Sequence, residues 1–117
     1  MTLPLQITWR GMESSPAVEA DIRAKAEKLK HTHDHIVSMR VVVEAPHAHH
    51  HKGRLYQLHI DVRVPGKEIA VTHDPGANHA HEDLYVATRD AFDAVRRQLK
   101  EYARIRRGDV KKHSQPR

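Results

Sequence analysis

The sequence predicts an α+β fold with the element order β-α-β-β-β-α, in which two helices cover one face of a four-stranded mixed sheet. Three observations predict it. Four short segments alternate apolar and polar residues or are rich in β-branched residues, as strands are. Two longer segments repeat apolar residues every three or four positions, as amphipathic helices do. The 117 residues are enough for one domain with a single core.

Local signals delimit the first strand and the first helix. The strand is expected where three apolar side chains alternate with polar ones, at Leu5, Ile7 and Trp9. Gly11 ends it. Ser15 followed by Pro16 is typical of a helix N-cap with proline at the first helical position. The helix is expected over 16–30, with a buried stripe formed by Val18, Ile22, Ala26 and Leu29.

Three further strands are expected in the middle of the chain. A β-branched run predicts a strand over 36–44, with one face formed by Val37, Met39, Val41 and Val43. The longest alternation, over 56–64, predicts a strand whose other face is wet and carries Gln57, His59, Asp61 and Arg63. Pro65 and Gly66 predict a tight turn into a returning strand marked by Ile69 and Val71.

A long amphipathic helix is expected to follow Asp83. Its apolar stripe spans five turns and consists of Leu84, Thr88, Ala91, Val95, Leu99 and Tyr102. Gly108 is the expected stop. We therefore expect a folded domain over 1–107 and a basic, disordered tail over 108–117, because the tail has too little apolar content to order alone.

The basic residues are concentrated at the end of the sequence. The chain has 20 Lys and Arg against 15 Asp and Glu. Residues 96–117 hold nine of those basic residues and two of the acids. Clustered Lys and Arg gain by displacing counterions from nucleic acid, which favours a nucleic-acid partner. The alternative is a solvated segment that only aids solubility.

Several other functions are disfavoured. Cysteine is absent, which excludes disulfides and thiolate chemistry. None of the four serines lies in a nucleophile elbow, and no glycine loop could cradle phosphates. The apolar stretches are far shorter than the roughly 20 residues that cross a bilayer. We therefore expect a cytoplasmic binding protein that is not an enzyme, with no cofactor, no catalytic residues, no membrane and no small-molecule substrate.

Histidine is unusually frequent, with 12 residues. Six of them are candidates for anion or metal contacts: His47, His49, His50, His51, His79 and His81. His79 and His81 precede a helix N-terminus, which favours an anion. A specific metal site needs three or four ligands held by other groups, and a histidine-rich loop does not supply that frame. No metal site is therefore predicted.

The basic residues of the two helices could form one surface. On a helical wheel, Arg89, Arg96 and Lys100 lie opposite the apolar stripe, with Arg97 and Arg104 beside them. Lys25 and Lys28 share a flank of the first helix. Residues further along extend the surface, namely Arg106, Arg107, Lys111 and Lys112. The alternative is an ordinary solvated face with acids such as Asp93 and Glu101 interspersed.

Several short motifs occur in the order and spacing found in a known protein family. They are Leu5-Gln6-Ile7-Thr8, Lys25 with Lys28-Leu29, Asp34 before Ile36, Val41-Val42-Val43, and Asp83-Leu84-Tyr85 leading to Arg97-Gln98-Leu99. Together, over about residues 3–105, they resemble the short form of the ribosome hibernation-promoting factor and ribosome-associated inhibitor (sigma-54 modulation protein) family. The resemblance departs at Thr32 and His33, where the family commonly has aromatic residues.

The resemblance implies a fold like that of double-stranded-RNA-binding domains. It also implies binding to the small ribosomal subunit and its rRNA, which occludes the messenger and transfer RNA channel in stress or stationary phase. The matching RNA-contacting positions are Lys25, Lys28 and Arg97. Two alternatives stay open, a general double-stranded-RNA-binding module and a His-rich metal-binding stress protein. Ribosome dimerisation, the oligomeric state and a further domain downstream also stay open.

Overall fold

The computed structural model describes residues 4–45, 56–74 and 83–114, with side chains as far as residue 108. The elements follow the predicted order. They are β1 (Leu5–Arg10), α1 (Pro16–Thr32), β2 (Ser38–Glu44), β3 (Gln57–Val64), β4 (Lys67–His73) and α2 (Leu84–Ser114).

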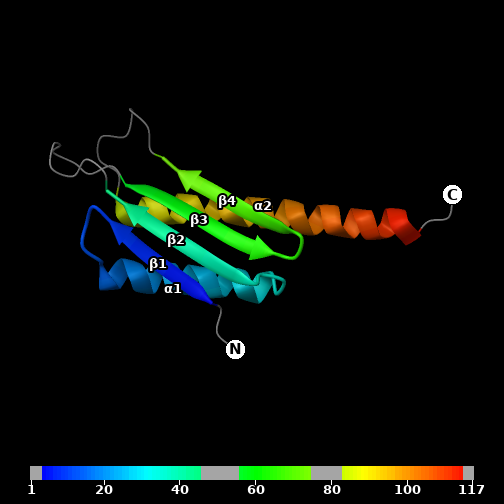
Figure 1. Ribbon diagram of the computed structural model, residues 1–117, viewed down its shortest axis with the longest axis horizontal. Helices are drawn as coiled ribbons and strands as arrows, with labels where there is room; N and C mark the ends of the chain where they lie inside the picture. The colour runs from blue at the N-terminus through cyan, green and yellow to red at the C-terminus, as the bar shows by residue number, and fades with distance from the viewer. Residues whose placement is uncertain (1–3, 46–55, 75–82, 115–117) are drawn as a thin grey trace.

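The four strands form one mixed sheet in the order β1-β2-β3-β4. β1 runs parallel to β2, with Leu5 opposite Met39, and the two later pairs are antiparallel. Both helices lie side by side on the same side of the sheet, α1 behind β1 and α2 behind β3 and β4 (Figure 1). This arrangement confirms the predicted α+β fold.

The core lies between the sheet and the helices. Alternation places one row of apolar side chains across the strands, and its central members Val41 and Ile60 are fully buried opposite each other. From the helices the buried residues are Val18, Ile22, Ala26, Leu29, Leu84, Ala87, Thr88, Ala91, Phe92, Val95 and Leu99. The hydroxyl of Thr88 donates to the Leu84 carbonyl at 2.8 Å, so this buried polar group is satisfied.

Two glycines adopt the left-handed conformation that the backbone requires. Gly66 has φ 79° in the turn between β3 and β4, as the Pro65-Gly66 pair predicted. Gly11 has φ 69°, and a Cβ there would lie 2.8 Å from the carbonyl oxygen of Ala45. Gly11 therefore allows the segment after β1 to approach the end of β2 closely.

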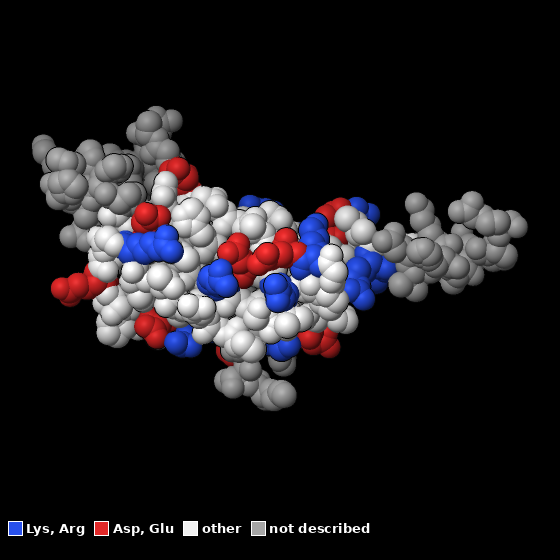
Figure 2. All heavy atoms as spheres, in the orientation of Figure 1, with Lys and Arg blue, Asp and Glu red and all other residues white. Residues whose placement is uncertain are grey.

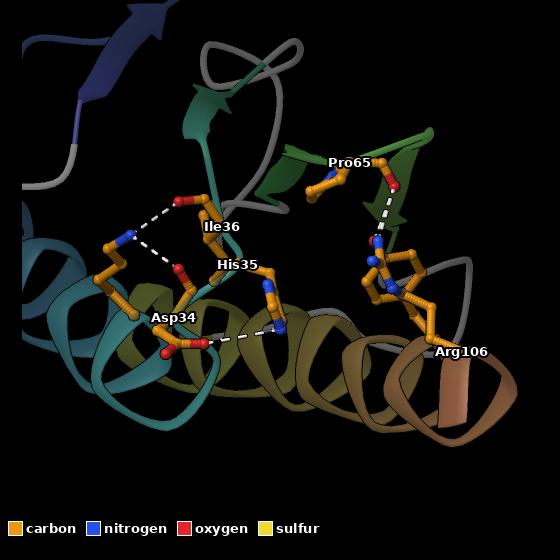
Figure 3. Close-up of polar contacts among 7 residues, drawn as sticks. Asp34, His35, Ile36, Pro65 and Arg106 are labelled. Carbon is orange, nitrogen blue, oxygen red and sulfur yellow. Dashed lines mark hydrogen bonds and ion pairs between the residues drawn. The ribbon is translucent and has the colours of Figure 1, made fainter. Parts of the chain in front are cut away.

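The segment between α1 and β2 differs from the prediction. The helix continues to Thr32, and β2 begins at Ser38 rather than at residue 36. Ile36 is buried, whereas Val37, expected on the same face as Met39, Val41 and Val43, is 51% exposed. Lys30 explains the difference, because its Nζ donates to the carbonyl oxygens of Asp34 at 3.2 Å and of Ile36 at 2.9 Å (Figure 3). These two bonds hold the segment in a turn that directs Ile36 into the core.

The C-terminal helix is longer than predicted. α2 continues through Gly108 to Ser114, so the expected stop at Gly108 is wrong. Gly108 does not adopt a positive φ, and nothing lies within 4 Å of the place a Cβ would take. A glycine inside a helix costs about 1 kcal/mol relative to alanine, which is too little to end the helix without a contact that turns the chain. As a result α2 extends beyond the end of the sheet (Figure 1).

No helix within the described ranges is long and apolar enough to span a membrane.

Candidate nucleic-acid interface

A cleft between α1 and α2 brings together four of the basic residues that the sequence singled out. Lys25 and Lys28 enter it from α1, and Arg89 and Arg96 enter it from α2. Its volume is about 370 Å³, and the remaining lining residues are Leu29, Thr32, His33, Phe92 and Asp93. The register of the two helices therefore places basic residues more than 60 positions apart in the sequence around one opening.

Three of these four cations have a carboxylate partner on their own helix. Nζ of Lys25 lies 2.9 Å from Oδ1 of Asp21. The guanidinium groups of Arg89 and Arg96 lie 3.0 Å and 3.5 Å from Oδ1 of Asp90 and Asp93. The two arginine pairs are largely open to solvent, and such pairs contribute about 0–1 kcal/mol, so a phosphate can replace their carboxylates at little cost.

Lys28 differs from its neighbours because it has no ion-pair partner in the part of the chain that the structure describes. It is exposed on the α1 side of the cleft. An unpaired ammonium can meet a phosphate without first breaking another contact. Lys28 is therefore the cation of the cleft that is most available to an anion.

The other predicted residues continue along α2 outside the cleft. Arg97, Lys100 and Arg107 are exposed, and within the described ranges none of them has an ion pair. Arg104 pairs with Glu101, and this hydrogen bond lowers the pKa of Glu101 and raises the pKa of Arg104. We call the following set, exposed except for the half-buried Lys25, the basic helix face: Lys25, Lys28, Arg89, Arg96, Arg97, Lys100, Arg104 and Arg107.

Arg106 is placed differently from the rest of the predicted set. Its guanidinium lies over the ring of Tyr102, 5.5 Å from the centroid, and donates to the Tyr102 hydroxyl at 2.7 Å. It also reaches the carbonyl oxygen of Pro65 at 3.5 Å (Figure 3). Arg106 thus joins α2 to the β3–β4 turn, away from the cleft.

The opposite face of the sheet has no such excess of positive charge. Its exposed or half-buried side chains include three arginines and three acids, Arg10, Arg40, Arg63, Glu44, Asp61 and Glu68. Figure 2 shows acidic and basic side chains interspersed over this side of the molecule. Over 84–108, by contrast, α2 carries seven Lys and Arg and three acids. The cationic excess of the described residues therefore lies with the helices.

His33 lies half-buried in the cleft. Burial lowers its pKa, with Asp34 opposing and His35 reinforcing the effect. The imidazole is therefore neutral near pH 7 and adds no charge to the cleft. The sequence did not predict His33, Leu29 and Phe92 as lining residues of the cleft, because only the packing of α1 against α2 reveals which side chains share the opening.

The six histidines predicted as anion or metal contacts lie outside the described residues: His47, His49, His50, His51, His79 and His81. Among the described residues, no three His, Asp or Glu side chains come together as metal ligands would.

Comparisons with known proteins give one sequence match and a set of structural matches. The family described as Sigma 54 modulation protein / S30EA ribosomal protein matches residues 5–107. A search of curated protein sequences gave no match.

Two solved structures resemble the fold. A ribosomal subunit interface protein from Coxiella burnetii superposes with a TM-score of 0.70 at 18% identity, covering 86% of this chain and 98% of that one. The N-terminal domain of Protein Y from Thermus thermophilus superposes with a TM-score of 0.65 at 22% identity, covering 87% of this chain and 99% of that one. At these identities the similarity supports the fold.

Proposed function

Because the chain belongs to the Sigma 54 modulation protein / S30EA ribosomal protein family, we propose that it binds the small ribosomal subunit through rRNA and occludes the messenger and transfer RNA channel. The family consists of ribosome-binding modulators and not of enzymes. In this proposal the protein acts in the cytoplasm, in stress or stationary phase. The solved structures add support, since one of them is named as a ribosomal subunit interface protein.

The observation that carries the proposal is the asymmetry between the two sides of the molecule. Over 16–32 and 84–108 the two packed helices carry 11 Lys and Arg against six Asp and Glu, and eight of these cations form the basic helix face, whereas the open side of the sheet has three of each sign. Contacts from Lys and Arg to phosphates supply most of the affinity for nucleic acid and do not depend on sequence. We therefore expect the helices to face rRNA and the sheet to face away from it.

The mechanism is steric and needs no chemical step. Helical RNA is recognised mainly by its shape and its backbone, which suits cations fixed on rigid helices. The carboxylates of Asp90 and Asp93 hold Arg89 and Arg96 near the cleft in the free protein. On binding, rRNA phosphates replace them, and the body of the domain fills space that messenger and transfer RNA need.

Co-sedimentation with ribosomal subunits over a salt series tests the proposal. We expect saturable binding to the small subunit that survives an excess of free duplex RNA and weakens linearly in log affinity against log salt. Equal competition by the duplex would favour a general double-stranded-RNA-binding module instead. A sucrose gradient of whole ribosomes in the same experiment reports whether the protein also pairs ribosomes.

A charge-reversed variant and a matched control locate the interface. The test variant changes Arg96, Arg97 and Lys100 to Glu, and the control changes Arg10, Arg40 and Arg63 on the open face of the sheet to Glu. Both variants lower the net charge equally, so general electrostatics affects them alike. We expect the first to lose subunit binding and the second to keep most of it, with circular dichroism confirming that both fold. Equal loss in the two variants would contradict binding through the helices.

A further inference from the structure

The cleft between α1 and α2 has the dimensions and the chemistry of a small-ligand site. Its volume of about 370 Å³ lies in the range of roughly 300–1,000 Å³ that is typical of ligand pockets. Charged and polar side chains line it together with two side chains from the core, Leu29 and Phe92. Such a combination orients a ligand by its charges and buries an apolar part beneath them.

The charges of the lining define the ligand's chemistry. Four cations and a single carboxylate, that of Asp93, face the opening. Two of the cations are partly neutralised from outside the lining, Lys25 by Asp21 and Arg89 by Asp90. The lining alone therefore has a formal excess of three positive charges, which falls to one while the pairs with Asp21 and Asp90 hold. A ligand phosphate that replaces these two carboxylates meets up to three uncompensated charges, which suits a diphosphate group better than a single carboxylate.

The uncharged part of the lining suits an aromatic ring. Leu29 and Phe92 are only 6% and 5% exposed, so they offer a floor fixed by the core. His33 is neutral near pH 7, because burial lowers its pKa, and it adds a second ring to the cleft. A nucleobase has apolar faces and polar edges, and the carboxylate of Asp93 can accept hydrogen bonds from ribose hydroxyls.

We propose that the α1–α2 cleft binds a free nucleoside diphosphate, with the phosphates among the Lys and Arg side chains and the base over Leu29 and Phe92. The binding itself does not depend on the ribosome. Lys28 and Arg96 also belong to the basic helix face, so a bound nucleotide excludes rRNA phosphates from them. That consequence rests on the proposed function and makes the nucleotide a regulator of ribosome binding.

Calorimetric titration of the isolated chain tests the site directly. The probes are ADP and GDP, compared with AMP, adenosine and inorganic pyrophosphate. We expect one-to-one, saturable binding of at least one diphosphate, tighter than that of AMP, adenosine or pyrophosphate. If pyrophosphate binds as tightly as ADP and GDP, the floor does not contact a base and the proposal is overturned. Absence of binding by both diphosphates overturns it as well.

Two neighbouring arginines provide a matched pair of variants. Arg96 lines the cleft, whereas Arg97, the next residue of α2, does not. Losing one charge-assisted contact corresponds to about tenfold in affinity, so we expect Arg96→Ala to weaken diphosphate binding by about that factor and Arg97→Ala to leave it within about twofold. Equal weakening in both variants shows general attraction of anions and overturns the proposal.

A variant that fills the cleft tests the site without removing a charge. Thr32 is exposed at the end of α1 and lines the cleft. We expect Thr32→Trp to abolish diphosphate binding while circular dichroism stays unchanged, and unimpaired binding in this folded variant would overturn the proposal. Titration without ribosomes tests nucleotide binding in the cleft, and sedimentation without nucleotide tests ribosome binding. Failure of the nucleotide proposal is therefore distinguishable from failure of the proposed function.

Discussion

The hydroxyl of Tyr102 donates a 2.7 Å hydrogen bond to the carbonyl oxygen of Pro65, a residue 37 positions earlier in the chain. The same hydroxyl accepts a hydrogen bond from Arg106, whose guanidinium also lies over the ring. Pro65 lies in the turn between β3 and β4, so the contact joins α2 to this end of the sheet. It therefore fixes the point from which the last turns of the helix extend.

We expect Tyr102→Phe to loosen this end of α2. The variant removes a donor to Pro65 and an acceptor for Arg106, and one hydrogen bond contributes about 0.5–1.5 kcal/mol to stability. Urea unfolding should show a loss of that size, and amide exchange should quicken over 103–108. Tyr85→Phe is the control, because Tyr85 is 47% exposed at the other end of α2. Equal effects of the two variants would contradict a specific role for Tyr102.

The N-cap of α1 provides a second test. The side chain of Ser15 accepts a hydrogen bond from the backbone N–H of Val18 at 3.3 Å, as its position before Pro16 predicted. Ser15→Ala should destabilise the protein by about 1 kcal/mol, because the first turn loses a partner for one of its N–H groups. Ser14→Ala changes the exposed neighbouring serine and should be nearly neutral in the same unfolding measurement.

Local sequence signals predicted most of the fold. They failed where contacts between residues distant in the sequence determine the structure. Alternation predicted the buried row through Val41 and Ile60, and the cap predicted the start of α1, because both depend on neighbouring residues. The turn before β2 was missed because it depends on Lys30 reaching across to backbone carbonyls. The cleft between the helices was predicted only in part, for the same reason. The wheel identified Arg89 and Arg96 as basic, whereas only packing against α1 shows that they share a cleft with Lys28.

Two glycines should respond in opposite directions to alanine. Gly11→Ala places a Cβ 2.8 Å from the Ala45 carbonyl oxygen at φ 69°, and such strain costs on the order of 1–3 kcal/mol. Gly108→Ala lies within α2, has open space for a Cβ and should stabilise the helix by up to about 1 kcal/mol. Thermal unfolding of the two variants beside the parent checks both signs. A destabilising Gly108→Ala would argue against a helix that continues past this residue.

The two lysines of the cleft should differ in their effect on ribosome binding. Lys28 has no ion pair among the described residues, so Lys28→Ala should remove one phosphate contact and lower the salt slope of binding by roughly one. Lys25→Ala removes a cation and also exposes the carboxylate of Asp21 to the RNA. We expect the additional change Asp21→Asn to restore part of the affinity lost in Lys25→Ala, as measured by sedimentation at several salt concentrations. If Asp21→Asn restores nothing, the pair has no part in binding.

The half-buried imidazole of His33 should make stability depend on pH. Burial lowers its pKa in the folded protein below the value of about 6.5 found in an unfolded chain, so the unfolded state binds more protons as the pH falls. The contribution of His33 to the free energy of unfolding is therefore fully present above about pH 6.5. It is lost as the pH falls through the pKa that His33 has in the folded protein. We expect His33→Gln to flatten the fall in unfolding free energy between pH 7.5 and pH 5, and His31→Gln, an exposed change on the same helix, to leave it unaltered.

Protonation of His33 should have the opposite effect on ligand binding: it lowers stability but strengthens the binding of anions. Protonated His33 adds a positive charge to the cleft, so an anion whose own charge stays constant over this pH range binds more tightly as the pH falls, although the fold becomes less stable. A general loss of structure in acid would weaken both properties together. Measuring anion affinity and unfolding free energy on the same pH series separates the two cases. In His33→Gln both trends should shrink, and a variant in which the affinity still rises as before would assign that rise to groups other than His33.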